Sequence, residues 1–239
     1  MGPDGSTERG FATTLSETSG VADHEGAVDI SPEHVAGTTP GVEAEVSISD
    51  GAIARTLRAY LDRHPNEQGV LVQAVQLVAA EQGLASRRTF PLHVTAGALL
   101  LRGGTEILLI EHRAYGIWLQ PGGHLEVEDD DLPAAALREL VEETGIDPAD
   151  VVLASAQPVY VECGLVPARP TRGEPAHWHL DFGYLFTTGD HTDVGLLQDE
   201  EVTGAAWYPL GVAARLIGAR VLRAVDPDAV IIAGASPRG

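Results

Sequence analysis

Hydrophobic positions at helical spacing mark one short segment near the middle of the chain. Four residues fall at i, i+3, i+4 and i+7, and this spacing predicts one buried stripe on a helix. These residues are Leu137, Leu140, Val141 and Thr144. Asp130 or Asp131 is a natural N-cap, and Gly145 suits the C-terminal end. Pro133 fits the first turn, where the N–H that proline lacks has no helical partner. The pattern therefore predicts a helix between these ends.

Patterns typical of strands surround this helix. Residues 93–102 and 105–113 are rich in Leu, Ile and Val, and the pair Gly103-Gly104 between them indicates a hairpin. Shorter strand-like segments follow at 151–154, 158–162 and 205–208. Residues 210–224 are predicted to form a final helix. Its expected core residues are Leu216, Val221 and Leu222.

Residues 177–187 alternate most clearly between apolar and polar positions. The apolar face carries Trp178, Leu180, Phe182, Tyr184 and Phe186. The other face carries His177, His179 and Asp181, and three interpretations of it stay open. It is a solvated polar surface, a surface where His179 or Asp181 contacts substrate or supports a general base, or a set of metal ligands. Two histidines at i, i+2 without another soft ligand are a weak indication of zinc.

The N-terminal part has a different character. Residues 1–47 are rich in Gly, Ser, Thr, Pro and acidic residues, with one Arg, and they are predicted to be a disordered acidic tail. Residues 48–88 predict a helical hairpin, capped at Asp50 and broken at His64-Pro65. This hairpin either packs on the following domain, at 89–230, or forms a homodimer contact. Residues 164–176 are expected to form a loop that covers a site, and 231–239 a loose tail.

Composition narrows the range of partners. The 239 residues carry 35 acidic and 15 basic side chains, a formal net charge of −20. Such a charge argues against nucleic acid or an anionic membrane as a general partner, because both need cationic patches. The one cysteine, Cys163, excludes an internal disulfide. No segment has the roughly 18 apolar residues of a membrane helix, and the first residues do not resemble a signal peptide. We expect a soluble cytoplasmic protein.

Three carboxylates, Glu139, Glu142 and Glu143, lie three and four residues apart near the end of the predicted helix, on the face opposite its apolar stripe. They repel one another, and negative charge near a helix C-terminus is unfavourable. Gly122-Gly123, upstream, can bring its backbone close to them. A hard cation resolves the repulsion, so we expect an Mg²⁺ or Mn²⁺ site. The alternative is a solvated acidic face with Arg138 as partial counter-ion.

Residues 123–146 resemble a Nudix box, with the pattern G-x5-E-x7-R-E-U-x-E-E-x-G-U, where U is aliphatic. The second half matches fully, at Arg138, Glu139, Leu140, Glu142, Glu143, Gly145 and Ile146. The first half departs from the pattern. Asp130 stands where the family has Glu, Gly123 lies one residue too far upstream, and Asp129 is the other candidate for the acidic position. In the family this acid pairs with the box arginine.

The resemblance implies a fold and a site. The fold class is α/β, an α/β/α sandwich with a mixed β-sheet. The implied metal ligands are Glu139, Glu142, Glu143 and the carbonyl of Gly122. Arg138 would orient a box carboxylate. The acidic loop before the last strand, at Glu200 or Glu201, often supplies one more ligand or a base.

The resemblance further implies metal-dependent hydrolysis of a phosphoanhydride bond in a nucleoside diphosphate linked to another moiety. Glu139, Glu201 and His179 stay open as the general base. Arg113 and Arg102 are candidates to meet phosphate oxygens. Trp118, Trp178 and Tyr160 are candidates to stack on a base. With His179 and Asp181, Arg113 and Trp118 make up the expected substrate-binding set.

Three other function classes stand beside hydrolysis. A Nudix-fold isomerase needs a catalytic cysteine in its own motif, which the surroundings of Cys163 do not resemble. A non-catalytic nucleotide-binding or regulatory module is the main alternative, and the intact box carboxylates favour the hydrolase over it. A structural protein that uses the hairpin and acidic tail is the third.

Overall fold

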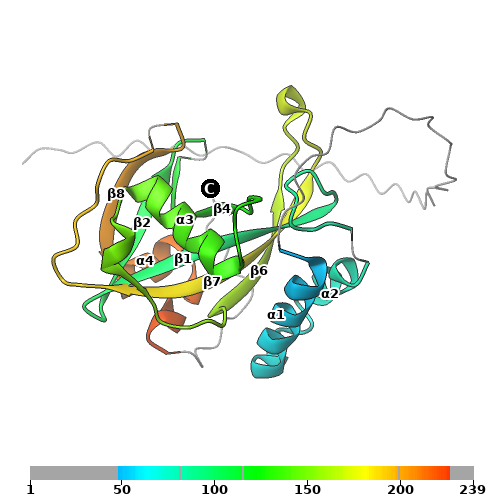
Figure 1. Cartoon of the computed structure of the whole chain (residues 1–239), viewed down its shortest axis with the longest axis horizontal. Coiled ribbons are helices and arrows are strands. Elements are labelled where there is room, and N and C mark those ends of the chain that lie inside the picture. Colours follow the sequence, from blue (N-terminus) through cyan, green and yellow to red (C-terminus); the bar gives the residue numbers. More distant parts are fainter. Residues whose placement is uncertain (1–47, 81, 115, 199, 227–239) are drawn as a thin grey trace, which may run out of the picture. The chain divides into compact units, whose positions relative to one another are not determined.

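The computed structural model describes residues 48–80, 82–114, 116–198 and 200–226. The predicted acidic tail at 1–47 and the predicted loose tail at 231–239 lie outside them. Eight strands form one mixed sheet, which confirms the predicted fold class (Figure 1). They are β1 (Leu92–Arg102), β2 (Glu106–His112), β3 (Ile117–Leu119), β4 (Gly122–His124), β5 (Val151–Leu153), β6 (Tyr160–Val166), β7 (His177–Thr188) and β8 (Val202–Pro209).

The sheet is built around the parallel pair β1 and β7, which stay in register from Leu92↔Trp178 to Arg102↔Thr188. All other pairs are antiparallel. β1 is buried along almost its whole length, as a central strand covered on both faces should be. The predicted hairpin at Gly103-Gly104 is confirmed, and both glycines have the positive φ that a tight turn requires.

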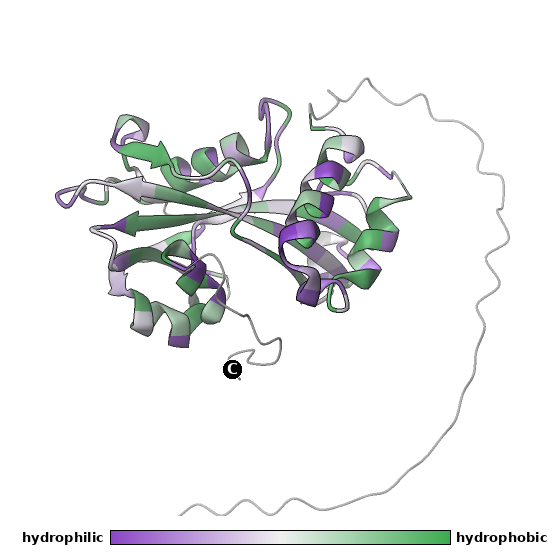
Figure 2. Ribbon diagram, turned by 90° about the horizontal axis from the view of Figure 1, so that it is seen from below, coloured by the Kyte–Doolittle hydropathy of each residue, from purple (hydrophilic) through white to green (hydrophobic). Residues whose placement is uncertain are grey.

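Helices cover both faces of the sheet. Alternate residues of β1 point to opposite sides, so Ala98 and Leu100 pack in the core under α3 (Leu132–Thr144), and Leu99 and Leu101 pack with α4 (Leu210–Ile217). Figure 1 shows α3 in front of the strands and α4 behind them. Figure 2, seen from below, shows hydrophobic stretches of strand between the helical layers. The 3-10 segments are η1 (Pro65–Glu67), η2 (Pro148–Asp150), η3 (Pro170–Arg172) and η4 (Ala219–Ala224).

The predicted helical hairpin is α1 (Asp50–Arg63), η1 and α2 (Val72–Val78). Its buried residues belong to the same core cluster as β1 and α3, so the hairpin packs on the sheet. The predicted cap was one residue off. Ser49 caps α1 through Ala52 N, and the Asp50 carboxylate instead accepts from the backbone N–H groups of Gly83 and Leu84, at 2.8 and 2.7 Å. The predicted domain boundaries and the homodimer stay predictions.

A buried ionic cluster ties the hairpin to the C-terminal end of the described chain. Arg223 of η4 donates to the Glu67 carboxylate and to the Tyr60 hydroxyl, and all three side chains are buried. The final helix was predicted as one piece, but Gly218, at φ 98°, separates α4 from η4. Of its predicted core residues, Val221 is fully buried. None of the described helices is both long enough and apolar enough to cross a membrane.

Candidate active site

α3 begins and ends where its local chemistry dictates. The Asp131 carboxylate accepts from Ala134 N at 2.8 Å, so Asp131 and not Asp130 is the N-cap. Gly145 ends the helix in the left-handed region at φ 63°, as predicted. Pro148, which begins η2 three residues later, could not continue the helix.

The predicted face of α3 was rotated relative to the true one. Its buried residues are Leu132, Ala135, Ala136, Glu139, Leu140, Glu143 and Thr144. Glu139 and Glu143 are 9% and 1% exposed, so the alternative interpretation of the three carboxylates as a solvated acidic face was wrong. Only Glu142 projects outward, with 46% of its side chain exposed.

The glycine strand β4 explains how two carboxylates come to be buried. Gly122 N donates to Glu143 Oε2 at 2.9 Å. A Cβ at position 123 would lie 2.6 Å from Glu139 Oε1, and one at position 122 would lie 2.7 Å from the Ala96 carbonyl oxygen. Only glycine permits so close an approach of strand, helix and carboxylates. The two glycines therefore form the wall against which Glu139 and Glu143 lie.

Arg138 is held by a set of acceptors around the same helix. Its Nε and Nη2 donate to the two oxygens of Asp129, each at 3.0 Å, and Nη2 also donates to the His124 carbonyl at 2.8 Å. Nη1 donates to Glu139 at 3.1 Å and Glu142 at 3.0 Å. Burial alone would lower the pKa of Arg138, but the bonds and charges of Asp129 and Glu139 outweigh it and raise the pKa.

The acidic partner of Arg138 is thus Asp129, and the assignment by counting to Asp130 was wrong. Asp129 is 4% exposed, whereas Asp130 is exposed. Asp129 also accepts from Glu126 N at 2.7 Å, so the loop closes on the same carboxylate. With Asp129 as the acid, Gly123 stands at the family spacing, and the extra residue lies between Asp129 and Arg138.

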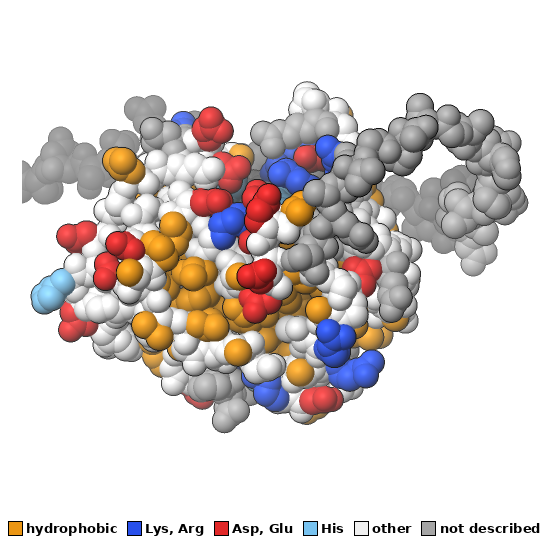
Figure 3. Space-filling view, in the orientation of Figure 1, with side chains coloured by type: hydrophobic (Ala, Val, Ile, Leu, Met, Phe, Trp, Pro, Cys, Tyr) orange, Lys and Arg blue, Asp and Glu red, His pale blue; other side chains and the backbone are white. Residues whose placement is uncertain are grey.

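Burial dominates the electrostatics of the two carboxylates. It raises the pKa of Glu139 to about 7 against the attraction of Arg138, and the pKa of Glu143 to about 8 against the hydrogen bond from Gly122. The neighbouring charge of Glu201 adds to both shifts. In Figure 3, acidic side chains gather over the region of α3 and β4.

A cavity of about 930 Å³ opens beside the glycine strand. Gly122, Gly123 and the residues before β8, Glu200 and Glu201, line it. The glycine strand lines this cavity. The three carboxylates of α3 lie beside that strand and do not line the cavity themselves; they are Glu139, Glu142 and Glu143. A cavity of this size is typical of sites for nucleotide-sized ligands.

One wall of the cavity is a polar network that the sequence reasoning largely missed. The Asp181 carboxylate accepts from Tyr160 Oη at 2.8 Å, Thr95 Oγ1 at 3.0 Å and Gln120 Nε2 at 3.4 Å. Arg220 donates to Gln120 Oε1 at 2.9 Å. Burial raises the pKa of Asp181 despite these donors. Tyr160 was considered for base stacking, but its ring is fully buried.

Four histidines line another part of the cavity: His93 of β1, His124 of β4, and His177 and His179 of β7. The interpretation of residues 177–181 as a solvated polar face was therefore wrong. Burial lowers the pKa of His124 and His179 to about 3, and Arg87 and the neighbouring imidazoles add to the shift. No local pattern in the sequence pointed to His93 and His124, because the parallel register His93↔His179 and the pair Thr95↔His124 bring them together.

Some of the other candidate residues line the cavity and others do not. Arg113 lines the cavity, and its backbone N–H donates to the backbone carbonyl of Glu201 at 2.7 Å. Cys163 also lines it, and burial raises the pKa of its thiol, which disfavours the thiolate. Trp118 is not among the lining residues, and its ring packs edge-on against Tyr208, with centroids 5.1 Å apart. Arg102 pairs with Glu106 at 2.8 Å and lies over the Trp207 ring.

Comparison with known proteins decides the family. The model of the NUDIX domain matches residues 91–228, more than half of the chain. The chain belongs to this family. The resemblance of residues 123–146 to a Nudix box is thereby confirmed, and so is the predicted enzyme class, a Nudix-type pyrophosphohydrolase.

Similar proteins include a probable DHNTP pyrophosphohydrolase of Lactococcus lactis subsp. cremoris, 31% identical over 121 residues that cover 49% of this chain and 68% of that protein. The Nudix chain is also similar to an Ap4A hydrolase of C. elegans in a binary complex, at 22% identity and a TM-score of 0.44 over 54% of this chain and 93% of the other. The dihydroneopterin triphosphate pyrophosphohydrolase of E. coli is 19% identical, with a TM-score of 0.44 over 56% and 93%.

Proposed function

We propose that this Nudix protein hydrolyses a phosphoanhydride bond in a nucleotide derivative, with Mg²⁺ or Mn²⁺ as cofactor. The observation that carries the proposal is the pair of buried carboxylates, Glu139 and Glu143, against the glycine strand. Ionising both of them in a buried site costs free energy unless positive charge is added. All donors at this place are oxygens, which suits a hard divalent cation.

The residues present fit such a cation. Glu139 and Glu143 are its proposed buried ligands, Glu142 is the proposed exposed one, and the Gly122 carbonyl completes the set. When bound, the metal neutralises the diphosphate and activates water. Arg138 orients two of the ligands, because its Nη1 bonds to Glu139 and Glu142 while Asp129 holds the rest of the guanidinium.

Glu201 is the proposed general base. Its charge contributes to the raised pKa of both buried carboxylates, so it lies within electrostatic reach of them, and it lines the cavity. Glu139 is a weaker candidate because Arg138 occupies one of its oxygens. His179, with its pKa lowered to about 3, is a poor proton acceptor near neutral pH.

The substrate occupies the cavity in this proposal. Arg113 reaches phosphate oxygens from the cavity wall, and Asp181 and His179 contact the remainder of the molecule. Asp181 is held by Tyr160 and Gln120, so it presents its carboxylate at a fixed place. Trp118 has no part in this set, because its ring packs against Tyr208.

The test is phosphate or pyrophosphate release across nucleoside diphosphate and triphosphate derivatives, with Mg²⁺, with Mn²⁺ and with chelator. DHNTP leads the panel because a relative is named as its probable pyrophosphohydrolase. We expect turnover of one compound class, only with metal. Folded protein that binds nucleotides but hydrolyses none of them would favour the non-catalytic binding module.

The base is tested by Glu201→Gln, with exposed Glu128→Gln as matched control. We expect Glu201→Gln to lower kcat by about 100-fold, within the range for general base catalysis, and to leave metal affinity unchanged. An unchanged kcat would remove Glu201 from this role.

A further inference from the structure

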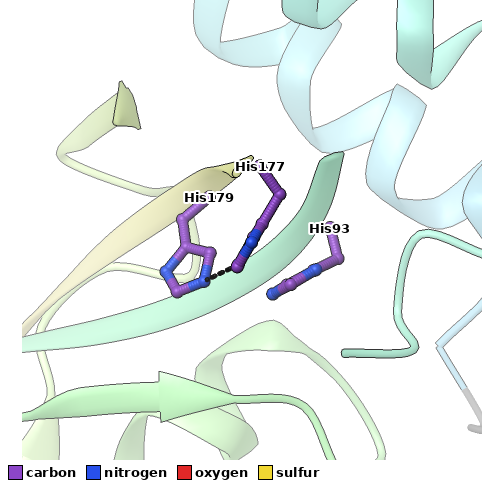
Figure 4. A group of neighbouring side chains, drawn as sticks. All are labelled: His93, His177 and His179. Atoms are coloured by element: carbon purple, nitrogen blue, oxygen red, sulfur yellow. Dashed lines mark hydrogen bonds between the residues drawn. The ribbon is translucent and has the colours of Figure 1, made fainter. Parts of the chain in front are cut away.

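Three imidazole rings converge at the first residues of β1 and β7 (Figure 4). They belong to His93, His177 and His179, and one ring nitrogen from each lies within 4.8 Å of the others. Ring centroids are 4.7 to 5.1 Å apart. This group differs from the carboxylates of α3, because its donors are imidazole nitrogens at the starts of the two parallel central strands.

Two of the rings are oriented by backbone carbonyls. His93 Nδ1 lies 3.1 Å from the Thr89 carbonyl oxygen, and His177 Nδ1 lies 2.8 Å from the Pro175 carbonyl oxygen. A carbonyl oxygen only accepts, so each Nδ1 carries the proton and each Nε2 keeps a lone pair. Histidine ligands in metal sites are fixed by the same kind of outer hydrogen bond.

The Nε2 atom of His93 is a buried acceptor. His93 is 1% exposed, and among the described residues its Nε2 has no hydrogen-bond partner. A buried acceptor without a partner is unfavourable, because it has lost its hydrogen bond to water and gained none in return. Since its lone pair points into the histidine group, a ligand that accepts electron density there would satisfy it.

The distance between the Nε2 atoms of His177 and His179 fits a shared metal ion. His177 Nε2 and His179 Nε2 face each other at 3.2 Å. Two nitrogens bound to tetrahedral Zn²⁺ at about 2.0–2.1 Å lie roughly 3.3–3.4 Å apart. The pair is therefore already near the separation that zinc coordination requires. The alternative, a hydrogen bond from His179 to His177, satisfies that pair but leaves His93 without a partner.

We propose that His93, His177 and His179 bind Zn²⁺, at a second metal site distinct from the proposed Mg²⁺ or Mn²⁺ site. Imidazole nitrogens suit zinc, whereas magnesium and manganese prefer oxygen. Three protein ligands leave a fourth position open, as in zinc sites that bind water or substrate. This position faces the cavity, which all three histidines line.

The experiment uses the full chain without an affinity tag, stripped of metal by chelator and equilibrated with Zn²⁺ at low concentration. We expect His93→Ala with His177→Ala to remove one equivalent of bound zinc, and each single variant to weaken zinc binding by at least about 100-fold. That is more than the 10- to 100-fold cost of losing an outer-shell partner. His191→Ala, at an exposed position, is the matched control and should bind zinc as the wild type does.

A second measurement needs no variant. Cobalt(II) replaces zinc and absorbs in the visible when nitrogen-bound in four-coordinate geometry. We expect this absorption to persist under about a thousandfold excess of Mg²⁺, which would occupy the carboxylate site. Loss of the band under Mg²⁺, no uptake of either metal by the wild type, or equal zinc binding by folded histidine variants would overturn the proposal. None of these readouts depends on hydrolysis, so this site and the proposed function fail separately.

Discussion

Asp129→Asn tests the brace between the acidic loop and α3. The Asp129 carboxylate is 4% exposed and accepts hydrogen bonds from Glu126 N and, on both oxygens, from Arg138, whose side chain is 18% exposed. Removing one partner of a buried ion pair typically costs about 3–5 kcal/mol. Arg138 keeps its bonds to Glu139, Glu142 and the His124 carbonyl, and the amide oxygen of the variant can still accept. We therefore expect the low end, about 3 kcal/mol.

The assay is urea unfolding in metal-free buffer, followed by tryptophan fluorescence and circular dichroism. For a domain of this size, a loss of about 3 kcal/mol in the free energy of unfolding would also lower the melting temperature by roughly 6–12 °C. Asp130→Asn is the control, because Asp130 is exposed, and it should stay within about 0.5 kcal/mol of the wild type.

The two variants together decide whether Asp129 holds Arg138. Equal stability of the two variants, or a larger loss for Asp130→Asn, would refute the brace. The same variant should also lower metal-dependent activity, because a released Arg138 no longer orients Glu139 and Glu142.

Three further predictions follow from the same contacts. Gly123→Ala should lower metal-dependent activity by at least about tenfold without unfolding the protein, because its Cβ would lie 2.6 Å from Glu139 Oε1. In metal-free protein, burial raises the pKa of Glu139 to about 7 and of Glu143 to about 8 from 4.5, so the folded state binds protons more tightly than the unfolded chain. That stabilisation is complete below about pH 4.5 and is lost as pH rises through both folded values, so the melting temperature should fall between about pH 7.5 and 8.5, and Mn²⁺ should reduce the fall. Arg223→Met should destabilise by about 3–5 kcal/mol in urea unfolding, because it leaves a buried carboxylate unpaired.

Each of these has a control and a result that contradicts it. Gly211→Ala, where an added Cβ meets nothing within 4 Å, should keep full activity, and equal activity of both glycine variants would contradict the close approach. The pH window begins about one unit above the ordinary histidine value of 6.5, where histidines of the unfolded chain are mostly neutral, so the lowered histidine pKa values add little slope there. A flat or rising melting temperature would contradict burial of the carboxylates. Arg215→Met, at an exposed position, should be nearly neutral, and equal effects of the two arginine variants would contradict the buried cluster.

Local chemistry was readable from the sequence. The two ends of α3, near Asp131 and at Gly145, depend on the backbone preferences of single residues, and so does the turn at Gly103-Gly104. The alternation along β7 was also predicted, because side chains of a strand alternate whatever lies on either face.

Non-local pairing could not be read in the same way. The burial of Glu139 and Glu143 depends on β4 lying against α3, and β4 is placed there by its pairing with β1. Likewise, the approach of His93 to His179 depends on a parallel register across more than eighty residues. Counting along the box also failed at Asp129, because an extra loop residue shifts the number and the hydrogen bonds decide the partner.

The most direct measurement of the central claim is the Mn²⁺-dependent hydrolysis rate of the best panel substrate for wild type, Glu139→Gln, Glu143→Gln and the exposed control Glu128→Gln. Metal catalysis supplies several kcal/mol, so losing a ligand should cost about 100-fold or more in rate. We expect that loss in both buried variants, with folded protein, and wild-type rates in the control. Wild-type, metal-dependent rates in folded Glu139→Gln and Glu143→Gln would contradict the claim that these carboxylates hold the catalytic metal.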